Sequence, residues 1–155
     1  MSKPYYKRAV LLEMAVAIED SAKDFYDSLS NRLPQNRIVF EQLAKDEDGH
    51  AKRYRQLLAS GGNVYSTGEE RALADYSIKV MEELGIISNL RMGADRARGI
   101  SDLRSAIDAA VQLEKDTLLF YHNLVMDLGS DDRQVIYKII DVEYAHLSKL
   151  QHLKP

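Results

Sequence analysis

Apolar residues recur along this chain at intervals of three and four, which is the spacing of one face of an α-helix. Four long stretches carry this pattern, at about 7–32, 34–59, 101–128 and 130–155. Pro34 separates the first two stretches, and Gly129 separates the last two. Ser101-Asp102 and Ser130 are suited to begin the third and fourth helices. The pattern therefore predicts an all-α protein.

The segment 60–100, between the helix pairs 7–59 and 101–155, has a different amino-acid composition. It holds six of the eight glycines, which is typical of a connection. Apolar residues at helical intervals within 69–84 still predict a short helix, through Leu73, Tyr76, Val80 and Leu84. A helix of about 25 residues is about 37 Å long, and the segment can span that distance. We expect a crossover that returns along the bundle; a lid or a dimer contact is compatible with it.

The composition narrows the possible classes of function. At 155 residues with 45% hydrophobic and 29% charged residues, the chain is expected to form one domain, 1–155. Its formal charge of −3, with no basic stripe, argues against nucleic-acid binding. The absence of cysteine excludes disulfides and thiolate-ligated metals. Neither a signal peptide nor a run of about 18 apolar residues is evident, so we expect a cytoplasmic protein without a membrane span.

Each helical stretch places one glutamate within its apolar face. These glutamates are Glu19, Glu47, Glu114 and Glu143. Two of them are followed, three residues later, by His50 and His146. Residues i and i+3 share a helix face, so each carboxylate and its imidazole are expected to point into the same interior.

The two halves of the chain also match each other. Tyr26 and Tyr121 each follow the first glutamate of their half by seven residues, and a Glu-x-x-His motif comes at nearly the same distance beyond. This is an internal repeat of helix pairs. A chance match of one motif is easy to accept, whereas a chance match of the whole pattern is not.

Four carboxylates in an apolar interior would be strongly destabilised as bare anions. Two divalent cations would balance their charge. Oxygen-rich ligation with one imidazole per metal suits Fe(II) or Mn(II), with zinc as another occupant. The alternative is that the glutamates form ion pairs between helices, for which Lys23 is the main candidate.

On these residues the chain resembles the ferritin-like di-iron carboxylate superfamily, specifically its rubrerythrin-like branch built only of the four-helix domain. The resemblance implies a ferritin-like four-helix bundle with a long crossover between the second and third helices. It implies Glu19 and Glu114 as terminal ligands of two iron ions. Glu47 and Glu143 would bridge the ions, and His50 and His146 would each bind one. Tyr26 and Tyr121 would hydrogen-bond a carboxylate across the site, although either could simply pack in the core.

Two features depart from the rubrerythrin pattern. Rubrerythrins add a cysteine-ligated rubredoxin domain, which a chain without cysteine lacks. They also carry a further glutamate three residues after the third-helix ligand, where this sequence has Thr117. The six remaining ligands resemble the set found in bacterioferritin.

The resemblance implies a redox enzyme that reduces O₂ or hydrogen peroxide, in protection against oxidative stress, with electrons from a separate donor protein. Two alternatives stay open. One is a ferroxidase or iron-handling protein, and the other is a bundle that its metal ions hold together structurally. Apolar residues in the crossover are compatible with a homodimer.

The halves differ at the residue before each Glu-x-x-His motif, which is Asp46 in one and Val142 in the other. Metal-bound histidines usually donate their other N–H to a carboxylate or carbonyl. We therefore predict that Asp46 orients His146, whereas His50 needs another partner, such as Asp141 or a backbone carbonyl. The alternative is that Asp46 is only a solvated acid.

Three further residues lie outside this scheme. Gly49 lies within the first motif, where close helix approach is one explanation of a glycine. His122 and His152 lie off the ligand faces and are expected at the surface or in packing.

Overall fold

The computed structural model describes residues 4–61, 72, 76, 79, 83 and 92–155. Four long helices dominate it: α1 (Pro4–Arg32), α2 (Arg37–Ser60), α5 (Leu103–Leu124) and α6 (Ser130–Leu153). A short helix, α4 (Gly93–Ala97), precedes α5. The described residues contain no strand, so the all-α prediction is confirmed.

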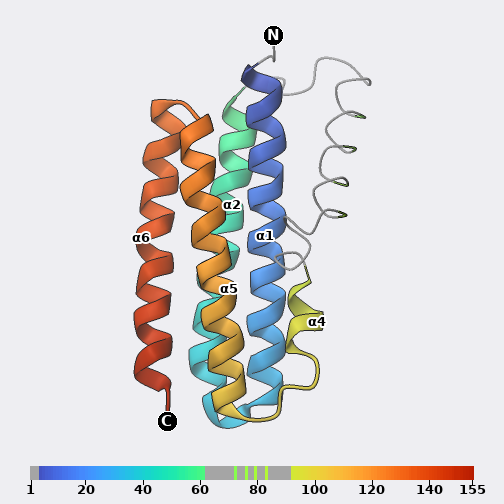
Figure 1. Ribbon diagram of the computed structural model, residues 1–155, viewed down its shortest axis with the longest axis vertical. Helices are drawn as coiled ribbons and strands as arrows, with labels where there is room; N and C mark the ends of the chain where they lie inside the picture. The colour runs from blue at the N-terminus through green and yellow to red at the C-terminus, as the bar shows by residue number, and fades with distance from the viewer. Residues whose placement is uncertain (1–3, 62–71, 73–75, 77–78, 80–82, 84–91) are drawn as a thin grey trace.

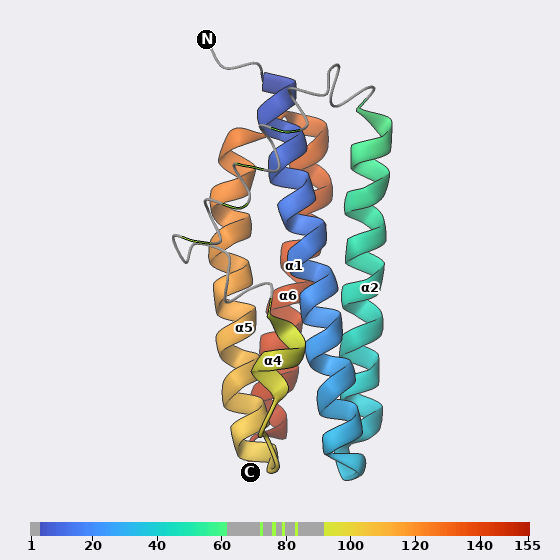
Figure 2. The same cartoon turned by 90° about the vertical axis from the view of Figure 1, so that its right-hand side faces the viewer.

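The four long helices lie side by side as a bundle (Figures 1 and 2). Helix α1 packs against α2 and α5, and α6 packs against the same two helices, so α1 and α6 lie on one diagonal. The chain reverses direction between α1 and α2 and again between α5 and α6. Helix α5 begins at the end of the bundle opposite to the last turn of α2. The connection between them therefore has to cover the length of the bundle, as a crossover does.

Helix boundaries follow the local sequence closely. Leu33 leaves the helical conformation before Pro34, and a 3₁₀ turn (Pro34–Asn36) leads into α2. The side chain of Asp102 accepts a 2.8 Å hydrogen bond from the N–H of Ser105 and so caps α5. Helix α5 ends earlier than predicted, because a 3₁₀ turn (Val125–Asp127) replaces its last turn. Ser130 is the first residue of α6, and Gly129 occupies the N-cap position, so Ser130 does not cap this helix as predicted.

The crossover is described only in part. Residues 72, 76, 79 and 83 are helical, whereas most of the helix predicted within 69–84, with Leu73, Val80 and Leu84, lies outside the described residues. Tyr76 is 64% exposed, so it does not pack in the bundle as an interior residue would.

Helix α4 packs closely against α1 (Figure 2). The N–H of Gly93 donates a 2.7 Å hydrogen bond to the hydroxyl of Ser21. A Cβ at Gly93 would lie 1.7 Å from the carbonyl oxygen of Ser21. Only glycine fits this approach, so this residue allows the end of the crossover to rest on the bundle.

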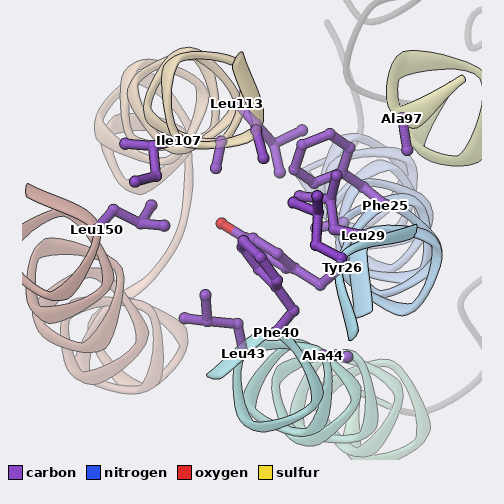
Figure 3. Close-up of a cluster of buried hydrophobic side chains, with 14 residues drawn as sticks. Phe25, Tyr26, Leu29, Phe40, Leu43, Ala44, Ala97, Ile107, Leu113 and Leu150 are labelled. Atoms are coloured by element: carbon purple, nitrogen blue, oxygen red, sulfur yellow. The ribbon is translucent and has the colours of Figure 1, made fainter. Parts of the chain in front are cut away.

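Two apolar layers fill the bundle. All four long helices contribute to the first layer, which lies at the end of the bundle where α1 ends and α5 begins and includes Phe25, Tyr26, Phe40, Ile107 and Leu150 (Figure 3). The second is built around Leu12, Tyr54, Tyr121, Ile136 and Ile140. The glutamates in the middle of each helix lie between these layers, so apolar packing closes both ends of the site.

An ion pair ties three helices together at the α1 N-terminal end. Nε of Arg8 lies 2.5 Å from Oδ2 of Asp132 at the start of α6. The same guanidinium donates a 2.8 Å hydrogen bond to the carbonyl of Leu57 on α2. Within the part of the chain that the structure describes, no helix is long and apolar enough to cross a membrane.

Candidate metal centre

Six ionisable side chains converge in the middle of the bundle. Helix α1 contributes Glu19, α5 contributes Glu114, and α2 and α6 each contribute a Glu-x-x-His pair. All six are buried, and the four glutamates are at most 1% exposed: Glu19, Glu47, His50, Glu114, Glu143 and His146. The helix periodicity alone placed each of them on an inward face, and the packing of the helices brings the faces together.

Their ligand atoms form two groups of four, and within each group all atoms lie within 4.8 Å of one another. One group is Glu19, Glu47, His50 and Glu143, and the other is Glu47, Glu114, Glu143 and His146. Glu47 and Glu143 therefore belong to both groups, whereas each of the remaining residues belongs to one. This is the arrangement expected of two neighbouring cation positions that share two carboxylates.

Both imidazoles turn Nδ1 towards the shared carboxylates. Nδ1 of His50 lies 3.0 Å from Oε1 of Glu143 and 3.2 Å from Oε2 of Glu47. Nδ1 of His146 lies 3.0 Å from Oε2 of Glu143 and 3.1 Å from Oε1 of Glu47. The two rings are 6.1 Å apart between centroids, so both lie close to the shared pair.

The concentration of charge changes the pKa values of these groups. Burial by itself would lower the pKa of His50, but the carboxylates of Glu143, Glu19 and Glu47 raise it to about 12. The pKa of His146 is likewise raised well above its usual value, against the effect of burial. Burial and the charge of Glu143 raise the pKa of Glu114 to about 8, and the same two causes raise that of Glu47. Protons therefore partly neutralise the carboxylates when no other cation does so.

The donor atoms fit a metal centre. Oε2 of Glu19 and Oε1 of Glu47 are buried and lie 3.5 and 3.1 Å from a histidine Nδ1, but neither accepts a hydrogen bond of good geometry, and a cation between the helices would satisfy both. Among the described residues no Lys or Arg pairs with the four glutamates; Lys23 instead lies 3.0 Å from Asp27 near the surface. The ion-pair alternative is therefore not supported for these glutamates. Carboxylates with one imidazole per ion suit Fe(II), Mn(II) or Zn(II).

Two tyrosines reach across the bundle in a reciprocal arrangement. The hydroxyl of Tyr26 on α1 donates to Glu114 on α5, and the hydroxyl of Tyr121 on α5 donates to Glu19 on α1. Burial and the adjacent carboxylate raise the pKa of both phenols well above the usual value, so both stay protonated. Each tyrosine thus holds one oxygen of its glutamate and leaves the other oxygen for the centre.

Asp46 reaches His146 as the sequence predicted, with Oδ2 3.1 Å from Nε2. Its Oδ1 accepts a 3.0 Å hydrogen bond from Gln42, one turn earlier on α2. We did not identify Gln42 from the sequence, although an amide four residues before a carboxylate is a recognised helix pair. The polar contacts of His50 all use Nδ1, so within the described residues Asp141 is not its partner.

The other residues singled out by sequence lie away from the centre or beside it. His122 and His152 are exposed, with contacts to Tyr144 and to the carbonyl of Ser148. Thr117 is buried on α5, three residues after Glu114. A Cβ at Gly49 would meet nothing within 4 Å, so close helix approach does not explain this glycine.

One comparison with known proteins agrees with this geometry. A protein-family model described as Rubrerythrin matches residues 11–154. A search of curated proteins and a search of solved structures gave no match.

Proposed function

This chain belongs to the rubrerythrin family, and from this premise we propose that it is a di-iron carboxylate enzyme that reduces O₂ or hydrogen peroxide. Its electrons would come from a separate donor protein. The observation that carries the proposal is the sharing of Glu47 and Glu143 between two groups of four buried ligands.

We assign the ligands as follows. Glu19 and His50 would hold one iron, Glu114 and His146 would hold the other, and Glu47 and Glu143 would hold both. Manganese or zinc could occupy the same donors. Two adjacent iron ions supply the electron-transfer chemistry that amino-acid side chains lack.

The surrounding residues would keep this centre in one geometry. Tyr26 and Tyr121 each fix a terminal glutamate through a single oxygen. Asp46 fixes the ring of His146 through Nε2. The apolar layers at both ends of the centre exclude bulk water, which strengthens every electrostatic interaction inside.

Cation loading would displace protons. In the metal-free site the raised pKa values of His50 and His146 keep both rings protonated at neutral pH. Ligand imidazoles must lose the proton on the nitrogen that binds, so metal binding and proton release are linked.

A ferroxidase that oxidises and holds Fe(II) is the second candidate. The observation in its favour is Thr117, which stands where rubrerythrins carry an additional glutamate ligand. The remaining six residues resemble the bacterioferritin set. Under this candidate Fe(II) itself is the reductant, and no donor protein is required.

Anaerobic loading with Fe(II), followed by stopped-flow mixing with O₂ or with hydrogen peroxide, tests the proposal. We expect two iron ions per chain, about 3.5–4 Å apart as in other two-metal sites, and rapid repeated turnover with peroxide when a reductant is present. A single slow oxidation per iron would favour the ferroxidase instead. Inert bound iron would favour a structural role, and failure to bind two ions would overturn the di-iron assignment.

A further inference from the structure

The buried hydroxyl of Tyr54, near the metal centre, takes no part in the proposed binding of the two ions. Tyr54 on α2 is 0% exposed, and its hydroxyl makes no hydrogen bond of good geometry among the described residues, although the hydroxyl of Tyr121 lies close to it. It lies one helical turn beyond His50, on the same face of α2. A buried hydroxyl without a partner loses its hydration without compensation.

Tyr54 has no equivalent tyrosine at the matching position in the other half of the repeat. The ring of Tyr54 packs against that of Tyr121, with centroids 5.6 Å apart, and Tyr121 already donates its own proton to Glu19. In the second half of the repeat, the residue four positions after His146 is Leu150, which packs in the apolar layer around Tyr26 (Figure 3). Among the residues that the structure describes, the half of the centre that contains Glu19 and His50 therefore has a spare hydroxyl, and the half with Glu114 and His146 has none.

Metal ions would not satisfy this group. Oε2 of Glu19 and Oε1 of Glu47, which also lack a hydrogen bond of good geometry within the described residues, are acceptors that a cation can bind. A phenol that keeps its proton needs an acceptor instead. Burial and the charge of Glu19 raise the pKa of Tyr54 well above its usual value, which keeps that proton in place.

We propose that Tyr54 donates a hydrogen bond to a small ligand of two or three atoms, anionic or oxygen-bearing, that binds on the Glu19 and His50 side of the centre. The inference rests on the proposed function, because the ligand would bind to the metal-loaded site. It assigns different tasks to the two halves. The half supported by Asp46 holds its ion, and the half beside Tyr54 receives the incoming molecule.

The substitution Tyr54→Phe tests the proposal with sodium azide as the probe. Phe keeps the ring and removes only the hydroxyl, and Tyr137→Phe removes a hydroxyl from an exposed tyrosine as the matched control. Azide would be titrated into the iron-loaded ferric protein and followed by its charge-transfer absorbance. A hydrogen bond to a charged partner corresponds to a loss of about 10- to 100-fold in azide affinity, which we expect for Tyr54→Phe alone.

Two further readouts separate a hydrogen bond from a packing effect. The asymmetric stretch of bound azide should shift in the infrared spectrum of Tyr54→Phe and stay unchanged in Tyr137→Phe. In the metal-free protein, Tyr54→Phe should leave the melting temperature unchanged or raise it, since a partnerless hydroxyl is removed. Tyr54→Leu, which copies Leu150, should show the same loss of azide affinity if Tyr54→Phe yields too little folded protein.

Failure of the inference is distinguishable from failure of the proposed function. If Tyr54→Phe and the wild type both hold two iron ions and bind azide equally well, Tyr54 has no such role. A clear loss of stability in metal-free Tyr54→Phe would mean that the hydroxyl already bonds within the protein, which also overturns the inference. If the wild type binds no iron pair, both the proposed function and this inference are wrong.

Discussion

Oδ2 of Asp46 on α2 lies 3.1 Å from Nε2 of His146 on α6, across the bundle. The side-chain amide of Gln42 donates a 3.0 Å hydrogen bond to the other oxygen of the same carboxylate. The imidazole of His146 is thereby fixed from behind while Nδ1 faces the shared glutamates. The other half has no equivalent, because the residue in the matching position is Val142.

We predict that Asp46→Asn weakens metal binding at the position of His146 by about 10- to 100-fold, and leaves the position of His50 nearly unchanged. Calorimetric titration of the metal-free protein with Fe(II) under anaerobic conditions would resolve the two steps. Asp48→Asn is the matched control, since Asp48 pairs with Lys52 at the surface. Unchanged affinity in Asp46→Asn would show that this contact does not support a ligand.

Substitution of a shared glutamate should remove more bound metal than substitution of a terminal one. Glu47 belongs to both ligand groups and Glu19 to one. We therefore expect Glu47→Ala to retain neither ion after desalting, whereas Glu19→Ala retains about one per chain. Metal analysis by mass spectrometry gives the ratio directly. Equal losses from the two variants would contradict the assignment of Glu47 as a bridge.

Two glycines should respond in opposite ways to the same substitution. Gly49 lies in the middle of α2 with free space where a Cβ would point, so Gly49→Ala should raise the free energy of unfolding by about 1 kcal/mol. Gly93→Ala would press against the carbonyl of Ser21 and should cost about 1–3 kcal/mol. Urea denaturation of the metal-free proteins measures both. Destabilisation by Gly49→Ala would point to a role for that glycine that its surroundings do not explain.

Arg8 should contribute to stability well beyond an ordinary surface ion pair. Its side chain and that of Asp132 are only 19% and 12% exposed, and removal of the guanidinium takes both of its hydrogen bonds from a largely buried carboxylate. We expect Arg8→Ala to lower the free energy of unfolding by about 2 kcal/mol. Arg37→Ala breaks the exposed pair with Glu41 and should leave the denaturation midpoint almost unchanged. Equal effects of the two variants would refute the special role of Arg8.

The cap of α5 should make stability depend on pH in the acid range. Hydrogen bonds from Ser105 hold the pKa of Asp102 below its usual value. A carboxyl group with a lowered pKa in the folded state stabilises the protein above its ordinary pKa of 3.8, and that stabilisation is lost as the pH falls through the folded value. The difference in melting temperature between wild type and Asp102→Ala should therefore be constant at neutral pH and shrink below about pH 4. A difference that stays constant down to about pH 2 would exclude the carboxylate as its source.

The amino-acid sequence alone was sufficient to predict the four helices and the inward position of six ligand candidates. Both depend on local periodicity, because residues three or four positions apart lie on the same face of a helix. Glu47 and His50 therefore share a face whichever helix packs against it. The repeat between the halves added a second, independent indication. The sequence also predicted that Asp46 lies beside His146, because the residue that precedes the Glu-x-x-His motif lies at the edge of the same helix face.

Tertiary packing decided the contacts that depend on the offset between distant helices. Tyr26 and Tyr121 could have packed as plain aromatic residues, and the hydroxyl of each reaches a glutamate only because α1 and α5 lie alongside each other in one register. The offset of α2 relative to α5 likewise places the ring of Tyr54 beside that of Tyr121, where its hydroxyl makes no hydrogen bond of good geometry among the described residues. A hydrogen bond forms only within a few tenths of an ångström of its optimal length. Periodicity specifies the face of a helix on which a residue lies, but it does not specify the axial offset of neighbouring helices to that accuracy.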